Sequence, residues 1–244
     1  MCTLLLRVEP AARWPVQVGA IRDEFVERSW DPPAQHWPEP WARFVGGRDH
    51  TAGGTWLAVD PSPERPAVAA LLNGFRRDPL PDGGARPTRG TLALRVLAGE
   101  GLPDGEALEP YDRFHVVLAT RARQEVWTWD GDALHHRDLD PGVHIVVNAG
   151  LDDYVDPLVP HFLPLLEAVD AADDQGWGGW PGLLTGDGLA GDHEAALIVA
   201  KDIEGRRYGT TSGALVAIGA DGQVRYDFSA DPADPAAWEP VVRR

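Results

Sequence analysis

The sequence is poor in cysteine and in long apolar runs. Cys2 is the only cysteine in 244 residues, which excludes an intramolecular disulfide and a thiolate zinc site and is compatible with a reducing compartment. No segment approaches the roughly 18 consecutive apolar residues that a membrane-spanning helix needs. The short apolar run at the start has no basic region before it, so we expect a cytoplasmic protein with no signal peptide and no membrane insertion.

Positive charge is also scarce. Lysine and arginine together number 22 against 38 aspartates and glutamates, which gives a net charge of −16 at pH 7. This charge argues against nucleic acid and against anionic membrane surfaces, so we expect a small-molecule substrate or ligand as the partner. Lys201 is the only lysine, and the preference for arginine indicates a bacterial genome of high GC content.

Several catalytic signatures are missing. The chain has no phosphate-binding G-x-x-x-x-G-K-[ST] loop, no G-x-S-x-G serine elbow and no H-E-x-x-H zinc motif. His135 and His136 are adjacent, but neighbouring residues of a strand point to opposite faces and make a poor shared metal site. We therefore expect no metal and no resident cofactor.

What the sequence does contain is a candidate nucleophile at its start. Cys2 follows Met1, and removal of an initiator methionine before a small side chain would leave this cysteine with both its thiol and a free α-amino group. An amine beside a thiol supplies the nucleophile with its own base. The alternative reading is an inert or buried lone cysteine.

Short apolar segments separated by glycine, proline and aspartate predict antiparallel strands. Cys2–Val8 and Val16–Ile21 form one predicted hairpin, and Gly54–Asn73 contains a second. Further predicted strands are Phe114–Ala119, Val126–Trp129, Leu134–Asp138, Gly142–Val147, Gly213–Ile218 and Gln223–Phe228. No repeat and no shift of composition divides the chain, so we expect a single domain over residues 1–244, with two packed sheets and helices outside.

Helices are predicted at three places, Thr91–Leu97, Leu158–Val169 and His193–Lys201, with a kink in the second at Pro164. Residues Ser29–Pro40 are rich in proline and tryptophan. This composition predicts an ordered irregular loop of the kind that shapes pockets.

Polar residues end several predicted strands. Arg22, Asp23 and Glu24 directly follow the second strand, and three consecutive charged residues do not all fit a core. Because that strand pairs with the one that begins at Cys2, we expect them near the thiol. Asn73 and Asn148 end two other strands, where an asparagine is either a turn residue or a side-chain amide aimed into a site.

These segments resemble the NRDE family, which is named for an Asn-Arg-Asp-Glu tetrapeptide and includes the eukaryotic transport and Golgi organisation protein two. The resemblance rests on Met1-Cys2-Thr3, Arg22-Asp23-Glu24-Phe25, Gly53-Gly54-Thr55-Trp56-Leu57 and Asn73, with looser matches at Arg89-Gly90, Asn148 and Tyr208-Gly209-Thr210. The family resembles N-terminal nucleophile hydrolases. This implies an α+β fold, a four-layer α-β-β-α sandwich of two antiparallel sheets.

The resemblance also implies a catalytic role for the start of the chain. Cys2 would supply the thiolate, and its own α-amino group would carry the proton. Arg22 would favour the thiolate through its positive charge. Asp23 would orient the amine by accepting its hydrogen bonds, and Glu24 is the alternative for this role.

Two asparagines complete the implied catalytic set. Asn73 resembles the oxyanion-hole amide of cysteine amidases of the bile-salt-hydrolase type. Asn148 resembles a second asparagine of that site, which positions substrate or amine. The residues implied to bind substrate are Glu24, Phe25, Thr55 and Trp56.

Two positions depart from the family pattern. Ile21 replaces the first asparagine of the tetrapeptide, and Thr211 stands where an arginine often follows Tyr-Gly-Thr.

The first hypothesis for the function is a cysteine amidohydrolase that cleaves a small linear amide through a thioester intermediate. The alternative is a non-catalytic binding or trafficking protein for haem or another apolar ligand. The eukaryotic branch of the family has been linked to haem handling, the chain has ten tryptophans, and Cys2 would be an axial thiolate.

Overall fold

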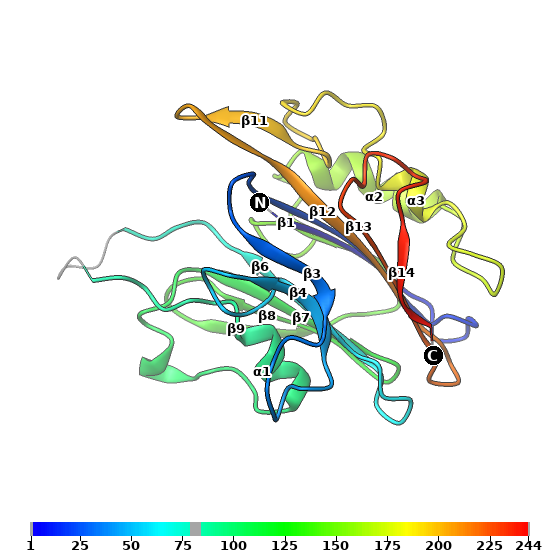
Figure 1. Cartoon of the computed structure of the whole chain (residues 1–244), viewed down its shortest axis with the longest axis horizontal. Helices are drawn as coiled ribbons and strands as arrows, with labels where there is room; N and C mark the ends of the chain where they lie inside the picture. The colour runs from blue at the N-terminus through cyan, green and yellow to red at the C-terminus, as the bar shows by residue number, and fades with distance from the viewer. Residues whose placement is uncertain (1, 79–83, 244) are drawn as a thin grey trace.

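The structure is a computed structural model that describes residues 2–78 and 84–243. Two antiparallel sheets face each other across a shared apolar core, and short helices lie on their outer sides (Figure 1). The expectation of two packed antiparallel sheets is confirmed. No helix in the described ranges is long and apolar enough to cross a membrane.

The first sheet, called sheet A, has the spatial order β10-β1-β2-β12-β13-β14, and β11 pairs with β12. Its strands are β1 (Cys2–Val8), β2 (Val16–Phe25), β10 (Gly142–Val146), β11 (Ala200–Ile203), β12 (Arg206–Ile218), β13 (Val224–Ser229) and β14 (Glu239–Arg243). The predicted hairpin of β1 with β2 is confirmed, and its register pairs Cys2 with Arg22. β2 continues through the polar block to Phe25 because β12 pairs with it on its other side.

The second sheet, called sheet B, has the order β3-β4-β5-β6-β7-β8-β9. Its strands are β3 (Trp30–Ala34), β4 (Val45–Asp49), β5 (Leu57–Asp60), β6 (Ala67–Asn73), β7 (Phe114–Thr120), β8 (Gln124–Trp129) and β9 (Leu134–Asp138). From β3 to β9, spatial neighbours are also neighbours along the chain. Sheet B is therefore a meander built from local connections, and the predicted strands at β5 to β9 are confirmed.

The core between the sheets follows from the alternation of side chains along each strand. Leu4, Leu6 and Val8 of β1 are buried against sheet B, whereas Leu5 lies in a second cluster on the outer face of sheet A. Because both faces of sheet A are covered, β1 and β2 are buried along almost their whole length.

Few helices cover the outer faces. α2 (Leu158–Ala168) and α3 (Trp180–Leu183) pack on sheet A, and α1 (Leu92–Ala98) packs on sheet B (Figure 1). The outer layers are thus thin, with turns and loops over much of both sheets. The two antiparallel sheets are compatible with a sandwich, and the helices are few.

A buried arginine joins sheet A to its outer layer. Arg7 of β1 donates hydrogen bonds to the backbone carbonyls of Leu166 and Val169 at the end of α2. The last carbonyls of a helix have no partners within the helix, and its C-terminus carries partial negative charge. A guanidinium there donates hydrogen bonds to these carbonyls and offsets the negative charge. Arg7 therefore fixes α2 to the strand that begins with Cys2.

The predicted helix at His193–Lys201 is wrong. This stretch forms turns and then enters β11, which pairs with β12. Local side-chain bonds compete with the helix, since the His193 ring accepts from the Ala195 N–H and the Thr210 hydroxyl accepts from the Val199 N–H. Tertiary pairing with β12 overrides the helical pattern.

The predicted irregular loop at Ser29–Pro40 is wrong in its first part, because Trp30–Ala34 forms β3. β3 is an edge strand, which tolerates proline because one side of its backbone needs no ladder bonds. Its pairing with β4 breaks between Asp31 and Ala34, where the two prolines stand. Strands β4 and β14 and the short α3 were not predicted.

A close approach of two glycines joins the segment before β5 to the segment before α1. Thr55 donates its N–H to the Gly90 carbonyl over 2.7 Å, and a Cβ added at Gly54 would lie 2.0 Å from that oxygen. No side chain other than hydrogen fits this contact. The Gly53-Gly54 and Arg89-Gly90 segments are therefore in direct backbone contact.

We expect Gly54→Ala to lower the free energy of unfolding by about 2–3 kcal/mol, because the new methyl group forces the two segments apart. Gly182→Ala is the matched control. It places the same methyl group in α3 with no atom within 4 Å, so it should change stability by less than about 1 kcal/mol, in the stabilising direction. Urea unfolding of both variants measures the difference, and equal effects would contradict the packing argument.

Candidate active site

A cleft of about 780 Å³ is lined by residues of both sheets. All of the residues proposed from the sequence lie around it: Cys2, Arg22, Asp23, Asn73 and Asn148 as catalytic candidates, and Glu24, Phe25, Thr55 and Trp56 as substrate-binding candidates. They come from stretches up to about 150 positions apart, so the fold has gathered them.

The thiol lies at the first residue of β1. Cys2 is partly buried and packs against the core between the sheets, and it is paired in register with Arg22. Burial raises the pKa of the Cys2 thiol, and the charge of Arg22 acts in the opposite direction. Burial outweighs the charges of the N-terminus and of Arg22, so the thiol form is favoured in the chain that begins with Met1.

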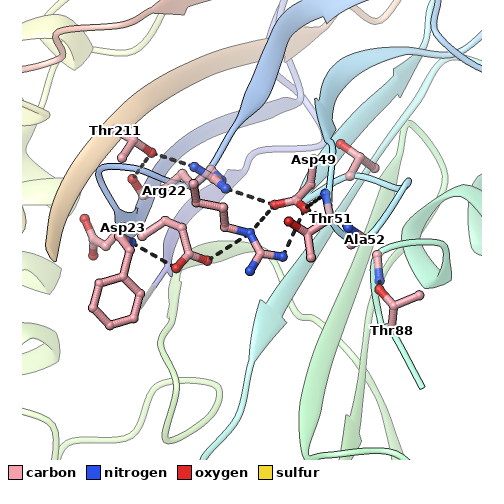
Figure 2. Close-up of polar contacts among 12 residues, drawn as sticks. Arg22, Asp23, Asp49, Thr51, Ala52, Thr88 and Thr211 are labelled. Carbon is pink, nitrogen blue, oxygen red and sulfur yellow. Dashed lines mark hydrogen bonds and ion pairs between the residues drawn. The ribbon is translucent and has the colours of Figure 1, made fainter. Parts of the chain in front are cut away.

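The side chain of Arg22 is buried, with a relative exposure of 4%. It donates to the Thr211 hydroxyl over 2.8 Å and to the Asp49 carboxylate over 3.2 Å, as Figure 2 shows. Its guanidinium also lies over the Trp56 ring, 4.5 Å from the centroid. Thr211, which stands where the family often has arginine, is therefore a hydrogen-bond partner of the tetrapeptide arginine.

Asp49 is the centre of this polar network (Figure 2). Its carboxylate accepts hydrogen bonds from Arg22, from Nε and Nη2 of Arg28, and from the backbone N–H groups of Thr51 and Ala52. Burial alone would raise the pKa of Asp49, but the bonds from Arg28 and Ala52 and the charge of Arg22 hold it below its usual range. Asp49 therefore stays ionised and compensates the buried guanidinium.

Asp23 occupies a different environment. It is almost fully buried and accepts a hydrogen bond of 2.7 Å from the Thr210 hydroxyl. Burial raises the pKa of Asp23 to about 6. A carboxyl that titrates near neutral pH suits proton handling, because small changes of environment switch its charge.

Glu24, the alternative to Asp23, faces other groups. Its carboxylate accepts the Phe25 N–H over 2.9 Å and lies 3.7 Å from Arg28. The Phe25 ring packs edge-on against Tyr208 and under the Arg206 guanidinium. These contacts leave Asp23 as the carboxyl better placed to act on the start of β1.

The two asparagines meet across the sheets. Asn148 follows β10 of sheet A, and its side-chain amide donates to the backbone carbonyl of Asn73 at the end of β6 of sheet B. The backbone carbonyl of Asn148 is in turn held by the His115 ring over 3.2 Å, and His115 bonds Thr128. Among the described residues, no hydrogen bond engages the side-chain amide of Asn73, which lines the cleft.

Thr55 and Trp56 have structural duties. The Thr55 hydroxyl donates to the Leu57 carbonyl and accepts the Leu57 N–H, so it is engaged within its own turn. Trp56 lies under Arg22 and meets Trp30 edge-on. Of the two, Trp56 offers the cleft an apolar surface, and Thr55 shapes the turn that carries it.

Sequence reasoning missed Asp49, Arg28 and Arg89 as members of the site. Nothing in the neighbouring sequence marks Asp49 as a site residue, because its contacts with Arg22 and Arg28 depend on the pairing of β4 and on the turn that follows. Arg89 and Thr210 stood in segments that carried the resemblance, so a test of those segments for chemistry would have found them.

One cluster away from the cleft has the geometry of a cation site. Glu125, His136 and Asp138 bring ligand atoms within 4.8 Å of one another. Glu125 already pairs with Arg123 over 3.0 Å and with His136 over 3.1 Å. A cation would have to displace the guanidinium, and we assign no metal to these residues.

A family model described as Transport and Golgi organisation 2 matches residues 1–175. The matched span runs from β1 through α2 and contains all five catalytic candidates, whereas the Tyr208-Gly209-Thr210 segment lies beyond it. No individual curated protein matches the chain. Because the match covers more than half of the sequence, the chain belongs to the transport and Golgi organisation 2 family, the NRDE family whose motifs it resembles.

Proposed function

We propose that the protein is an N-terminal cysteine amidohydrolase that cleaves a small linear amide through a thioester intermediate. The observation that carries the proposal is the meeting of Cys2, Asp23 and Asn73 around one cleft. A nucleophile, a carboxyl with a pKa near neutral and an unengaged amide donor are the groups that acyl transfer requires.

In the first step, removal of Met1 gives Cys2 a free α-amino group. This amine takes the thiol proton, and the sulfur forms a bond to the amide carbon of the substrate. The carbonyl oxygen becomes an oxyanion, and the Asn73 side chain is the donor proposed to stabilise it. Asp23 accepts hydrogen bonds from the ammonium group and stabilises its charge.

In the second step, the tetrahedral intermediate collapses, the C–N bond breaks, and the leaving amine takes the proton from the ammonium group. The acyl group remains on Cys2 as a thioester. The α-amino group of Cys2, now uncharged, then accepts a proton from water as that water attacks the thioester carbon. The C–S bond breaks, the acid is released, and the thiol recovers its proton.

Arg22 and Asn148 are positioning residues in this proposal. Arg22 is paired with Asp49, so its charge is largely compensated, and it holds the end of β2 beside the thiol. Asn148 holds the end of β6 through the Asn73 carbonyl, which fixes the backbone of the oxyanion donor.

The alternative, a carrier of haem or another apolar ligand, rested on the tryptophans, on the family's link to haem handling and on Cys2 as an axial thiolate. Half of the ten are buried in the packed clusters, namely Trp14, Trp37, Trp129, Trp177 and Trp180. The cleft is lined by six arginines and four carboxylates, which suits a polar ligand. No specific contact favours the carrier, so we retain the hydrolase.

The first test is acylation of the processed chain. Mature protein that lacks Met1 should form a thioester when it is incubated with N-acyl amides, and intact-mass spectrometry should detect one added acyl group. Cys2→Ala and a chain that retains Met1 should both show none, because one lacks the sulfur and the other lacks the free amine. Turnover by the chain that retains Met1 would refute the mechanism.

The second test is the pH dependence of hydrolysis. Because the pKa of Asp23 is about 6, kcat/KM should fall below about pH 6 as the carboxyl protonates and no longer stabilises the ammonium group. Asp23→Asn should lower kcat by about 100-fold or more and remove this acid limb. Glu24→Gln is the matched control and should keep it.

The same carboxyl predicts a stability effect of defined sign. The pKa of Asp23 is higher in the folded chain, about 6, than the roughly 3.9 of an unfolded aspartate. The folded state therefore binds the proton more tightly, and ionisation lowers stability as the pH rises through this window. Asp23→Asn should stabilise the protein by about 1–3 kcal/mol at pH 7 and by much less at pH 4, as measured by urea unfolding. An equal effect at both pH values would contradict the raised pKa.

A further inference from the structure

The cleft is electropositive within a strongly acidic protein. Its lining includes six arginines, namely Arg22, Arg28, Arg76, Arg86, Arg89 and Arg206. Against them stand four carboxylates, Asp23, Glu24, Asp49 and Asp112. The whole chain carries −16, so the lining of this cleft has the opposite sign to the chain as a whole.

Most of these arginines have carboxylate partners that are part of the fold. The ion pairs are Arg22 and Arg28 with Asp49, Arg86 with Asp112, and Arg206 with Glu27. The positive charge of these arginines is balanced by ion pairs that hold loops and strands together. In the described ranges, Arg76 and Arg89 have no carboxylate within ion-pair distance.

Arg89 is the better placed of the two. It is half-buried and donates one hydrogen bond of 2.7 Å, to the backbone carbonyl of Arg113. The next residue, Gly90, is locked against Gly54 and Thr55 by the close backbone contact described above. The guanidinium therefore projects from a rigid base, although it lies in a connecting segment.

The electrostatic surroundings connect Arg89 to the thiol. Burial lowers the pKa of Arg89, the charges of Arg76 and Arg28 lower it further, and Asp112 and Cys2 act in the opposite direction. Arg89 and Cys2 therefore lie within electrostatic range of each other in the same cleft.

A half-buried guanidinium without an anionic partner is unfavourable, because it has lost part of its hydration and gained no counter-charge. Its planar fork matches a carboxylate or another compact oxyanion through two parallel hydrogen bonds. An anion entering the cleft would relieve this cost and would be drawn in by the local positive charge.

We propose that the ligand of this cleft carries a carboxylate, or an oxyanion of similar size, and that Arg89 is the residue that binds it. The inference rests on the charge and burial of Arg89 and holds whether or not Cys2 performs hydrolysis. Combined with the proposed function, it makes the substrate a linear amide that bears a carboxylate, such as an N-acyl amino acid.

Alkylation of the single thiol tests the proposal directly. Iodoacetate and iodoacetamide attack the same sulfur and differ in charge, so the ratio of their rates at Cys2, divided by the ratio for N-acetylcysteine, measures attraction of the anion. With the iodoacetate rate as the numerator, this quotient should be about 10 for the wild-type chain at low salt. It should fall to within about twofold of one in Arg89→Gln, and any change in the thiolate fraction of Cys2 cancels in the quotient because both reagents attack the same thiolate.

Arg137→Gln is the matched control. Arg137 is an exposed residue of β9 outside the cleft, so its loss changes the net charge equally and should leave the quotient unchanged. An equal fall in both variants, or none in Arg89→Gln, would overturn the assignment. Because hydrolysis is not measured, failure here differs from failure of the amidase mechanism.

Thermal unfolding with added ligands supplies a second readout that needs no reactive thiol. Phenylacetate should raise the melting temperature of the wild-type chain, whereas the neutral phenylacetamide should not, and Arg89→Gln should abolish the difference. Phenyl phosphate distinguishes a phosphate site from a carboxylate site by which anion gives the larger shift. Equal shifts from the acid and the amide would refute anion recognition.

Discussion

The buried ion pair between Arg22 and Asp49 is the interaction on which the site depends. It joins β2 of sheet A to β4 of sheet B, so it fixes the distance between the layers where the cleft opens. A buried guanidinium is stable only when its charge and donors are satisfied, and Asp49, Thr211 and Trp56 together do this. The position of Cys2 follows, because Cys2 is paired with Arg22 in the sheet.

A second connection between the sheets has a different character. Asn148 and Asn73 meet through a neutral side-chain bond, supported by His115, whose pKa is lowered by burial. The cleft is thus held by an ionised contact on the side of the thiol and by neutral contacts on the side of the asparagines.

The net charge of the whole chain and the charge of the cleft lining have opposite signs. The chain as a whole has a large excess of acidic residues, while six arginines line the cleft that contains the thiol. Most of them form ion pairs with carboxylates of the fold, and among the described residues Arg76 and Arg89 form none. Composition alone argued only against nucleic acid and membranes, and it carried no information about this concentration.

The sequence by itself determined the β1–β2 hairpin, and with it the neighbourhood of Cys2 and Arg22, because a short turn between apolar strands fixes the register locally. It also identified Asn73 as the end of a strand and placed Asn148 shortly after another. Only the tertiary structure decided that β12 and β4 supply Thr210 and Asp49, that β11 replaces the helix expected at His193–Lys201, and that Arg89 lines the same cleft as the thiol. These depend on pairing between distant segments and on desolvation, and neither leaves a pattern in neighbouring residues.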